Sequence, residues 1–261
     1  MSENNNNTIG EASLAANAVD VGEPTSAPAP LLLADLVAAN RILFKHRVVD
    51  AFGHVSVRHD KAASRFLLAR NMAPGLVTED DIIEFDLEAN PVNAQGRSIY
   101  LERFIHSEIY RTRPEVMAVV HSHAPEVVPF GVVPAVKLRP IWHMSGFLGD
   151  GAPVFEIRDT AGNNSDLLIR SHALGAALSS SLGASHVVLM RGHGATVVGE
   201  SLAEAVFRAV YTQKNAELQL QAEQLGEINF LTAGEAQSTT LSVGSQIGRA
   251  WNLWKSEIDL A

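Results

Sequence analysis

The segment Val119-Val120-His121-Ser122-His123 decides the expected fold and the expected site. Its two valines are typical of a buried strand. Because side chains alternate between the two faces of a strand, His121 and His123 would project from the same face. Two adjacent imidazoles can hold a metal ion. The alternative is that both are ordinary hydrogen-bonded histidines at a strand edge.

A second glycine-flanked histidine strengthens the metal interpretation. Gly192-His193-Gly194 follows another apolar stretch, residues 187–190, and would place an imidazole on a tight turn. Three histidine ligands with open positions are typical of a catalytic metal site rather than a structural one. The chain has no cysteine, so any ligands must be histidine or carboxylate side chains. The sequence therefore predicts a divalent metal, Zn, Mn or Fe, held by His121, His123 and His193.

Composition narrows the class of partner. The 261 residues are 46% hydrophobic, which is enough for a sizeable core, and no segment has the length and apolarity of a membrane span. The net charge of −9 argues against nucleic acid and anionic membrane surfaces as partners. The N-terminus shows no basic segment followed by an apolar one, so we expect a cytoplasmic protein. With nucleic acid and membranes set aside, the expected partner is a small-molecule substrate.

The apolar periodicity predicts alternating helices and strands in one domain, residues 31–261, after a disordered leader, residues 1–30. Strands are expected at residues 54–59, 65–70, 82–86, 117–121, 154–157 and 186–190. Helices are expected at residues 31–48, 98–113, 166–182 and 201–225, with a short helix after Pro125 and a last helix from residue 234. Residues 132–153 are expected to form a loop, and Ser201 with Glu204 a capping box. The class is α/β or α+β.

Three matched positions, in this order and spacing, resemble the class II aldolase/adducin family over residues 31–261. They are Glu102, the segment of residues 113–123 that ends in His121-Ser122-His123, and Gly192-His193-Gly194. The resemblance implies a three-layer α/β/α sandwich with a mostly antiparallel central sheet, assembled as a homotetramer with active sites between subunits. It also implies that the three histidines hold the divalent metal and that Glu102 is the catalytic acid/base. The alternative for Glu102 is an exposed helix residue.

Several positions depart from the sugar-phosphate aldolases of this family. Gly53 is followed by His54 instead of asparagine, Arg70-Asn71 stand in the Thr-Gly region, and Tyr100-Leu101 replace a Ser-Ser pair. Small hydroxyls that would bind phosphate are thereby lost, which argues against a phosphorylated sugar. Arg70 and His54 suit a carboxylate or a phenolate, because a guanidinium binds a planar carboxylate through two hydrogen bonds. Arg70 as an ordinary surface residue at a strand end is the alternative.

The segments around His54, Trp142 and His193 look most like the decarboxylase branch of the family. A metal-dependent lyase that decarboxylates a hydroxylated aromatic or pyridine (di)carboxylate is therefore the leading hypothesis, with Glu102 and His54 as catalytic residues. Substrate-binding residues indicated by the resemblance are Ser56, Arg70, Asn71, His143 and Tyr211. The alternatives are an aldolase on an unphosphorylated hydroxy-keto acid, a non-haem iron oxygenase, and an adducin-like interaction domain. The three histidines and Glu102 argue against the last.

Overall fold

The computed structural model describes residues 15–16 and 26–259. Most of the expected leader, residues 1–30, lies outside the described residues, and the prediction that it is disordered stays a prediction. Over the described parts of the chain, no helix combines the length and the apolarity needed to cross a membrane.

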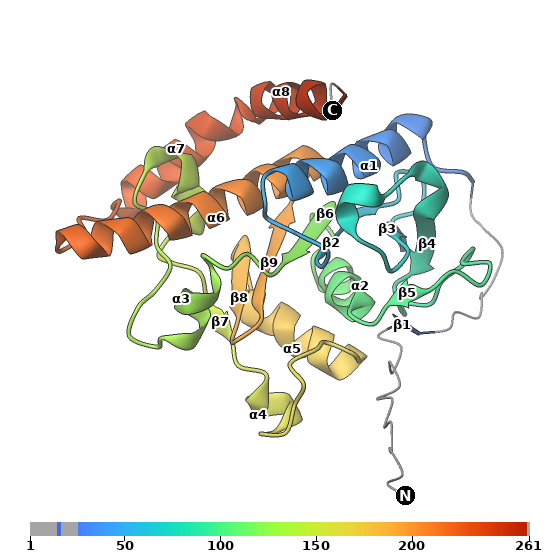
Figure 1. Ribbon diagram of the computed structural model, residues 1–261, viewed down its shortest axis with the longest axis horizontal. Helices are drawn as coiled ribbons and strands as arrows, with labels where there is room; N and C mark the ends of the chain where they lie inside the picture. The colour runs from blue at the N-terminus through green and yellow to red at the C-terminus, as the bar shows by residue number, and fades with distance from the viewer. Residues whose placement is uncertain (1–14, 17–25, 260–261) are drawn as a thin grey trace, which may run out of the picture.

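A seven-stranded sheet forms the centre of the molecule (Figure 1). Its spatial order is β4-β3-β2-β6-β9-β8-β7, and every neighbouring pair is antiparallel except β7 with β8. The strands are β2 (His54–Arg58), β3 (Arg65–Ala69), β4 (Ile82–Asp86), β6 (Ala118–Ser122), β7 (Val154–Phe155), β8 (Val187–Met190) and β9 (Gly194–Gly199). Two further short strands, β1 (Ala15–Ala16) and β5 (Ile99–Tyr100), pair separately. The sheet is mostly antiparallel, as predicted.

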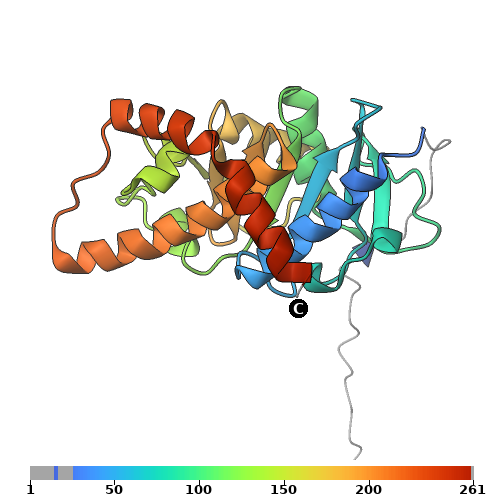
Figure 2. The ribbon, with the colours of Figure 1, turned by 90° about the horizontal axis from the view of Figure 1, so that it is seen from above.

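Helices cover both faces of this sheet. On one face lie α1 (Pro30–Lys45), α6 (Leu202–Leu225) and α8 (Ile247–Asp259), with α8 lying across α1 and α6 (Figure 2). On the other face lie α2 (Arg103–Thr112) and α5 (His172–Leu182), which pack against each other. Shorter elements are α3 (Val128–Val132), α4 (Arg158–Ala161), α7 (Ala233–Gly244), η1 (Pro74–Leu76), η2 (Glu79–Asp81) and η3 (His143–Leu148). The three-layer α/β/α prediction is confirmed.

The central strand β6 brings the histidines together. Val119 and Val120 are fully buried because β6 has a strand on each side and a helix layer on each face. The register pairs His121 with His54 on β2 and with Thr196 on β9. Directly opposed residues project from the same face of a sheet. His54 therefore lies beside His121.

Two glycines allow the backbone to approach closely at the site. Gly53 has φ +93°, and a Cβ there would stand 2.6 Å from the Val49 side chain, so this turn into β2 requires glycine. At Gly194, a Cβ would collide with the carbonyl oxygen of Ser122. The absence of a side chain at Gly194 lets β9 begin against β6, which holds the His193 turn next to His123.

Several element boundaries differ from the sequence prediction. The first helix ends at Lys45, and Arg47 adopts a left-handed conformation with φ 60°. The expected helix of residues 98–113 begins only at Arg103, because Ile99–Tyr100 forms β5. The expected loop of residues 132–153 contains the 3-10 helix η3. The single final helix is two helices, α7 and α8. Ser201 caps α6 as predicted, since its hydroxyl accepts from Glu204 N–H, but the Glu204 carboxylate accepts from the Glu200 N–H and so does not complete the capping box.

The helix predicted at residues 166–182 begins at His172, where Ser171 caps it by accepting from Leu174 N–H. The preceding residues are held in a non-helical conformation by contacts with distant parts of the chain. Ile169 N–H donates to Glu102, and the Leu167 carbonyl accepts from His193. These tertiary hydrogen bonds override the local helical spacing.

A half-buried histidine remote from the β6 histidines makes stability depend on pH. Burial, and then the charges of Arg208 and Arg113, lower the pKa of His186 from its ordinary value of 6.5 to about 4. The unfolded chain therefore takes up a proton at His186 at a higher pH than the folded protein does. This contribution to stability is complete above about pH 6.5 and is lost as the pH falls toward 4.

We expect His186→Gln to reduce this loss. The Tm of the variant minus the Tm of the unsubstituted protein should be a few degrees larger at pH 5 than at pH 7.5. A loss of about 1 kcal/mol in the free energy of unfolding lowers Tm by roughly 2–4 °C for a protein of this size. Circular dichroism melts at both pH values measure the difference. Parallel dependence of Tm on pH in the two proteins would contradict the assignment.

Candidate metal centre

Four side chains from three parts of the chain converge at the end of β6. Glu102, His121, His123 and His193 each offer one ligand atom, and these four atoms all lie within 4.8 Å of one another. The Nε2 atom of His123 lies 2.9 Å from that of His121 and 3.0 Å from that of His193. The Glu102 Oε2 atom lies 3.5 Å from His121 Nε2 and 3.6 Å from His193 Nε2. The structure thus brings together the three predicted ligands and the predicted acid/base.

The hydrogen bonds of Nδ1 in His121 and in His193 fix the tautomer of each ring. His121 Nδ1 lies 3.2 Å from the Ala195 carbonyl oxygen, and His193 Nδ1 lies 2.9 Å from the Leu167 carbonyl oxygen. A carbonyl only accepts, so each Nδ1 carries the proton and each Nε2 presents a lone pair. Converging lone pairs repel each other unless a cation lies between them. The donor set, with backbone carbonyls fixing the tautomers, therefore fits a divalent metal.

Glu102 lies at the N-terminal end of α2 and is buried beside the histidines. Its Oε1 accepts a 2.9 Å hydrogen bond from Ile169 N–H, which leaves Oε2 directed at the cluster. Burial alone would raise the pKa of Glu102, but the neighbouring His121 and His193 side chains and the hydrogen bond from Ile169 N–H outweigh it and lower the pKa to about 2. Glu102 is therefore a carboxylate at neutral pH.

His54 is buried between the cluster and a second histidine. Its ring centroid lies 5.0 Å from that of His121 and 4.5 Å from that of Tyr100, and its Nδ1 lies 2.6 Å from His106 Nε2. Burial, and then the neighbouring charges of His106 and His121, hold the pKa of His54 well below its ordinary value. His54 is therefore a neutral imidazole beside the candidate metal centre.

One cavity reaches the cluster. It has a volume of about 470 Å³, and among the four cluster residues His123 lines it. The other walls include Phe44, Arg47, Asp50 and Glu126 from the end of α1 and from the segments before β2 and after β6. A substrate in this cavity would meet the metal centre from the His123 side.

The predicted substrate-binding residues near β2 and β3 are engaged with protein groups. Arg70 Nε donates to Asp81 Oδ1 at 2.6 Å, and Asn71 N–H donates to the Ser98 carbonyl. Ser56 is fully buried, with its hydroxyl 2.6 Å from His106 Nδ1. The substrate-binding roles of Ser56, Arg70 and Asn71 stay predictions.

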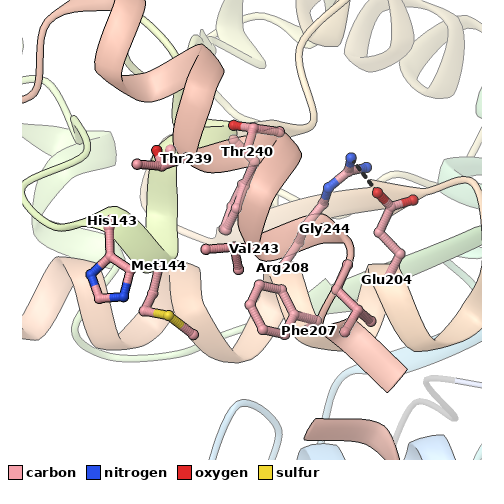
Figure 3. Close-up of a pocket in the computed structure, with 12 residues that line it drawn as sticks. His143, Met144, Glu204, Phe207, Arg208, Thr239, Thr240, Val243 and Gly244 are labelled. Carbon is pink, nitrogen blue, oxygen red and sulfur yellow. Dashed lines mark ion pairs between the residues drawn. The ribbon is translucent and has the colours of Figure 1, made fainter. Parts of the chain in front are cut away.

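His143 and Tyr211 lie in a different region. Both line a cavity of about 490 Å³ formed by η3, α6, α7 and α8, and none of the four cluster residues lines it. Figure 3 shows the adjoining space between η3, α6 and α7, with His143 beside Met144 and the Glu204–Arg208 ion pair of 2.7 Å on its far side. Their substrate-binding roles also stay predictions.

The site contains two residues that the sequence interpretation missed, His106 and Tyr110. They follow Glu102 by four and eight residues, and both are buried side chains of α2. Residues four apart on a helix share a face. This spacing was the available signal that both side chains would point toward the sheet with Glu102.

Comparisons with known proteins agree with this geometry. Residues 34–220 match the family model described as the Class II Aldolase and Adducin N-terminal domain. The chain is 40% identical over 255 residues to decarboxylase tropJ of Talaromyces stipitatus, covering 89% of this chain and 96% of that protein. It is 32% identical over 207 residues to a 3,4-dihydroxyphthalate decarboxylase of Arthrobacter keyseri, covering 73% and 78%. An L-fuculose 1-phosphate aldolase structure from Glaciozyma antarctica superposes with a TM-score of 0.72 at 24% identity, covering 91% and 94%.

Proposed function

Because the chain belongs to the class II aldolase and adducin family, we propose that it is a divalent-metal-dependent decarboxylase of a hydroxylated aromatic or pyridine carboxylate. The family and the decarboxylase relatives together support a lyase. The observation that carries the metal dependence is the convergence of the His121, His123 and His193 nitrogens with the Glu102 carboxylate next to a cavity.

The substrate class rests on two further observations. Two of the similar proteins are named decarboxylases, and one of those names specifies a dihydroxylated aromatic dicarboxylate. In this chain, His54 faces the cluster from the strand next to β6, where sugar-phosphate aldolases resembling it have asparagine. A neutral imidazole can hydrogen-bond to a phenol or a carboxylate. A planar hydroxy-acid fits these groups better than a sugar phosphate.

The chemistry divides between the bound metal and the side chains. A divalent cation held by His121, His123 and His193 would supply positive charge for the substrate oxygens and withdraw electron density from the carboxylated carbon. When the bond between the ring carbon and the carboxyl carbon breaks, its electron pair remains on the ring carbon, and that carbon must take up a proton.

Glu102 and His54 are the groups available to handle that proton. Glu102 is a carboxylate before reaction, since its pKa is lowered to about 2, so it would first accept a proton from a substrate hydroxyl. It would then return that proton to the ring carbon as CO2 leaves. His54, neutral and buried, would orient the substrate oxygen through a hydrogen bond.

The proposal is tested by the products that the purified full chain forms. Protein loaded separately with Zn, Mn or Fe(II) is incubated with hydroxybenzoate, dihydroxyphthalate and hydroxypyridine carboxylates, and CO2 release is measured beside a chelator-treated control. We expect metal-dependent CO2 release from at least one of these acids. Retro-aldol cleavage of a hydroxy-keto acid or a sugar phosphate, without CO2 release, would replace the decarboxylase assignment with an aldolase. Oxygen consumption would indicate an oxygenase.

We also propose that the protein is a homotetramer, as the family resemblance implies. Large exposed apolar side chains on α6, α7 and α8, namely Leu225, Leu241 and Leu253, are available for contact with another subunit. Trp251 and Trp254, which the composition of the C-terminal segment also offers as interface residues, are buried within the protomer, and Trp254 packs near Phe207. Light scattering should give about four times the 28.0 kDa of one chain. The cytoplasmic location stays a prediction.

A further inference from the structure

A continuous chain of buried hydrogen bonds begins at His54, beside the candidate metal centre, and runs between β2 and the face of α2 that packs on it. His54 Nδ1 lies 2.6 Å from His106 Nε2, His106 Nδ1 lies 2.6 Å from Ser56 Oγ, and Ser56 Oγ lies 2.8 Å from the Tyr110 hydroxyl. The exposed fractions of these four side chains are between 0% and 3%. Short distances and exclusion of solvent give such a chain a defined geometry.

The hydrogen bonds of this chain have a direction. The Tyr110 hydroxyl has two partners, Ser56 Oγ and the Val119 backbone, and the Val119 hydrogen bond lowers the pKa of Tyr110, as an N–H that donates to the phenol oxygen does. The phenolic proton is therefore satisfied only if Tyr110 donates to Ser56. The Ser56 hydroxyl, which has one proton, then donates to His106 Nδ1. Because His106 Nδ1 accepts this hydrogen bond, it is unprotonated, and the single ring proton of His106 lies on Nε2. Burial, which lowers the pKa of His106 to about 3, agrees with a neutral ring.

This direction determines the state of His54. His106 Nε2–H donates to His54 Nδ1, which must therefore be the acceptor. The ring proton of neutral His54 then lies on Nε2. Within residues 15–16 and 26–259, no group accepts a hydrogen bond from that nitrogen, so the N–H remains available for a ligand. Because His54 is the register partner of His121, this donor lies beside the candidate metal centre.

We propose that His106, Ser56 and Tyr110 are positioning residues that hold His54 in its Nε2–H tautomer and fix its ring beside the metal centre, so that it donates a hydrogen bond to a substrate oxygen. The benefit to substrate binding rests on the proposed decarboxylase function, whereas the tautomer itself does not. An imidazole in water exchanges between two tautomers, and only one of them presents a donor here. The chain removes the other tautomer before substrate arrives.

The chain could instead be merely structural, because buried polar groups need partners in any fold. The matched control is another buried serine that hydrogen-bonds to a residue of α2. Ser179 Oγ lies 2.6 Å from Thr112 Oγ1 and is not one of the four residues in the hydrogen-bond chain. Ser179→Ala therefore removes one buried hydrogen bond between two hydroxyls and leaves the partners of His54 in place. Ser56→Ala removes a hydroxyl of the same kind within the chain.

The first test observes the tautomer without any assay of activity. Zinc-loaded protein with 15N in its histidine rings is studied by solid-state NMR, and the His54 signals are identified by their loss in His54→Gln. In the unsubstituted protein and in Ser179→Ala, we expect Nε2 to be protonated and Nδ1 unprotonated. In Ser56→Ala and Tyr110→Phe, the second tautomer should appear. A proton on Nδ1 in the unsubstituted protein would overturn the proposal.

The second test separates positioning from stability. His106→Gln keeps an N–H donor where His106 Nε2 lies, whereas His106→Leu removes it. We expect kcat/KM to fall by roughly tenfold or more in His106→Leu, to recover partly in His106→Gln, and to stay unchanged in Ser179→Ala, with equal metal content throughout. If the variants of Ser56, His106 and Tyr110 lose Tm but keep kcat/KM unchanged, the hydrogen-bond chain has a structural role only. If the tautomer is as proposed but CO2 is not released, the decarboxylase function fails and the positioning chain stands.

Discussion

A protein in which His193 is replaced by alanine is expected to lose both its divalent metal and its activity while keeping its fold. His193 supplies one of the three converging Nε2 lone pairs, and its Nδ1–H is held by the Leu167 carbonyl. Loss of an outer hydrogen-bond partner of a metal ligand costs roughly 10- to 100-fold in metal affinity. Removing a ligand itself should cost more than about a hundredfold, and turnover should fall below detection.

The measurements are metal content after dialysis, metal titration and circular dichroism. His121→Ala and His123→Ala should behave like His193→Ala. His186→Gln is the control and should keep the metal, because His186 lies just before β8, near Arg208 and Arg113, and is not one of the four cluster residues. A fully metallated, active His193→Ala protein would remove His193 from the proposed ligand set.

Glu102→Gln is expected to lower kcat by about a hundredfold to ten-thousandfold while the histidines still hold the metal. The amide has nearly the same shape, and its oxygen can still accept from Ile169 N–H, but it can neither take up nor return a proton. The exchange therefore separates proton transfer from packing. Glu102→Asp, which keeps a carboxylate on a shorter side chain, should recover part of the rate.

Metal content decides between two roles for this carboxylate. Glu102 Oε2 lies within the set of four atoms that could surround a cation, so it is also placed to be a ligand. If Glu102→Gln loses metal in parallel with activity, Glu102 acts mainly as a ligand. If metal is retained and kcat falls with little change in KM, Glu102 is the acid/base group.

The spacing of residues in the sequence was enough to predict the strands that carry the site. The alternation around His54 and the valines before His121 correspond to β2 and β6, and Ile82–Asp86 is β4 as expected. A period of two residues reports which side chains share a face, and this held for His121 and His123. The glycines around His193 likewise indicated the turn that presents it.

The sequence could not show which distant backbone groups would complete the site. Residues 166–171 have apolar spacing that suits a helix, but Leu167 and Ile169 serve His193 and Glu102 through hydrogen bonds, and α5 begins only after them. Local spacing contains no information about partners that lie 26 and 67 residues away in the sequence. Tertiary packing therefore determined where this helix begins.

By itself, the sequence determined the residue types of the metal centre, the strand that carries His121 and leads into His123, and the likeness to one enzyme family. Only the tertiary structure decided that His106, Ser56 and Tyr110 form one hydrogen-bonded chain behind His54. The reason is that periodicity defines the face on which a side chain lies, whereas a hydrogen bond requires two atoms from separate elements to meet within about 3 Å. That meeting depends on how α2 packs against β2 and β6, which no local pattern in the chain specifies.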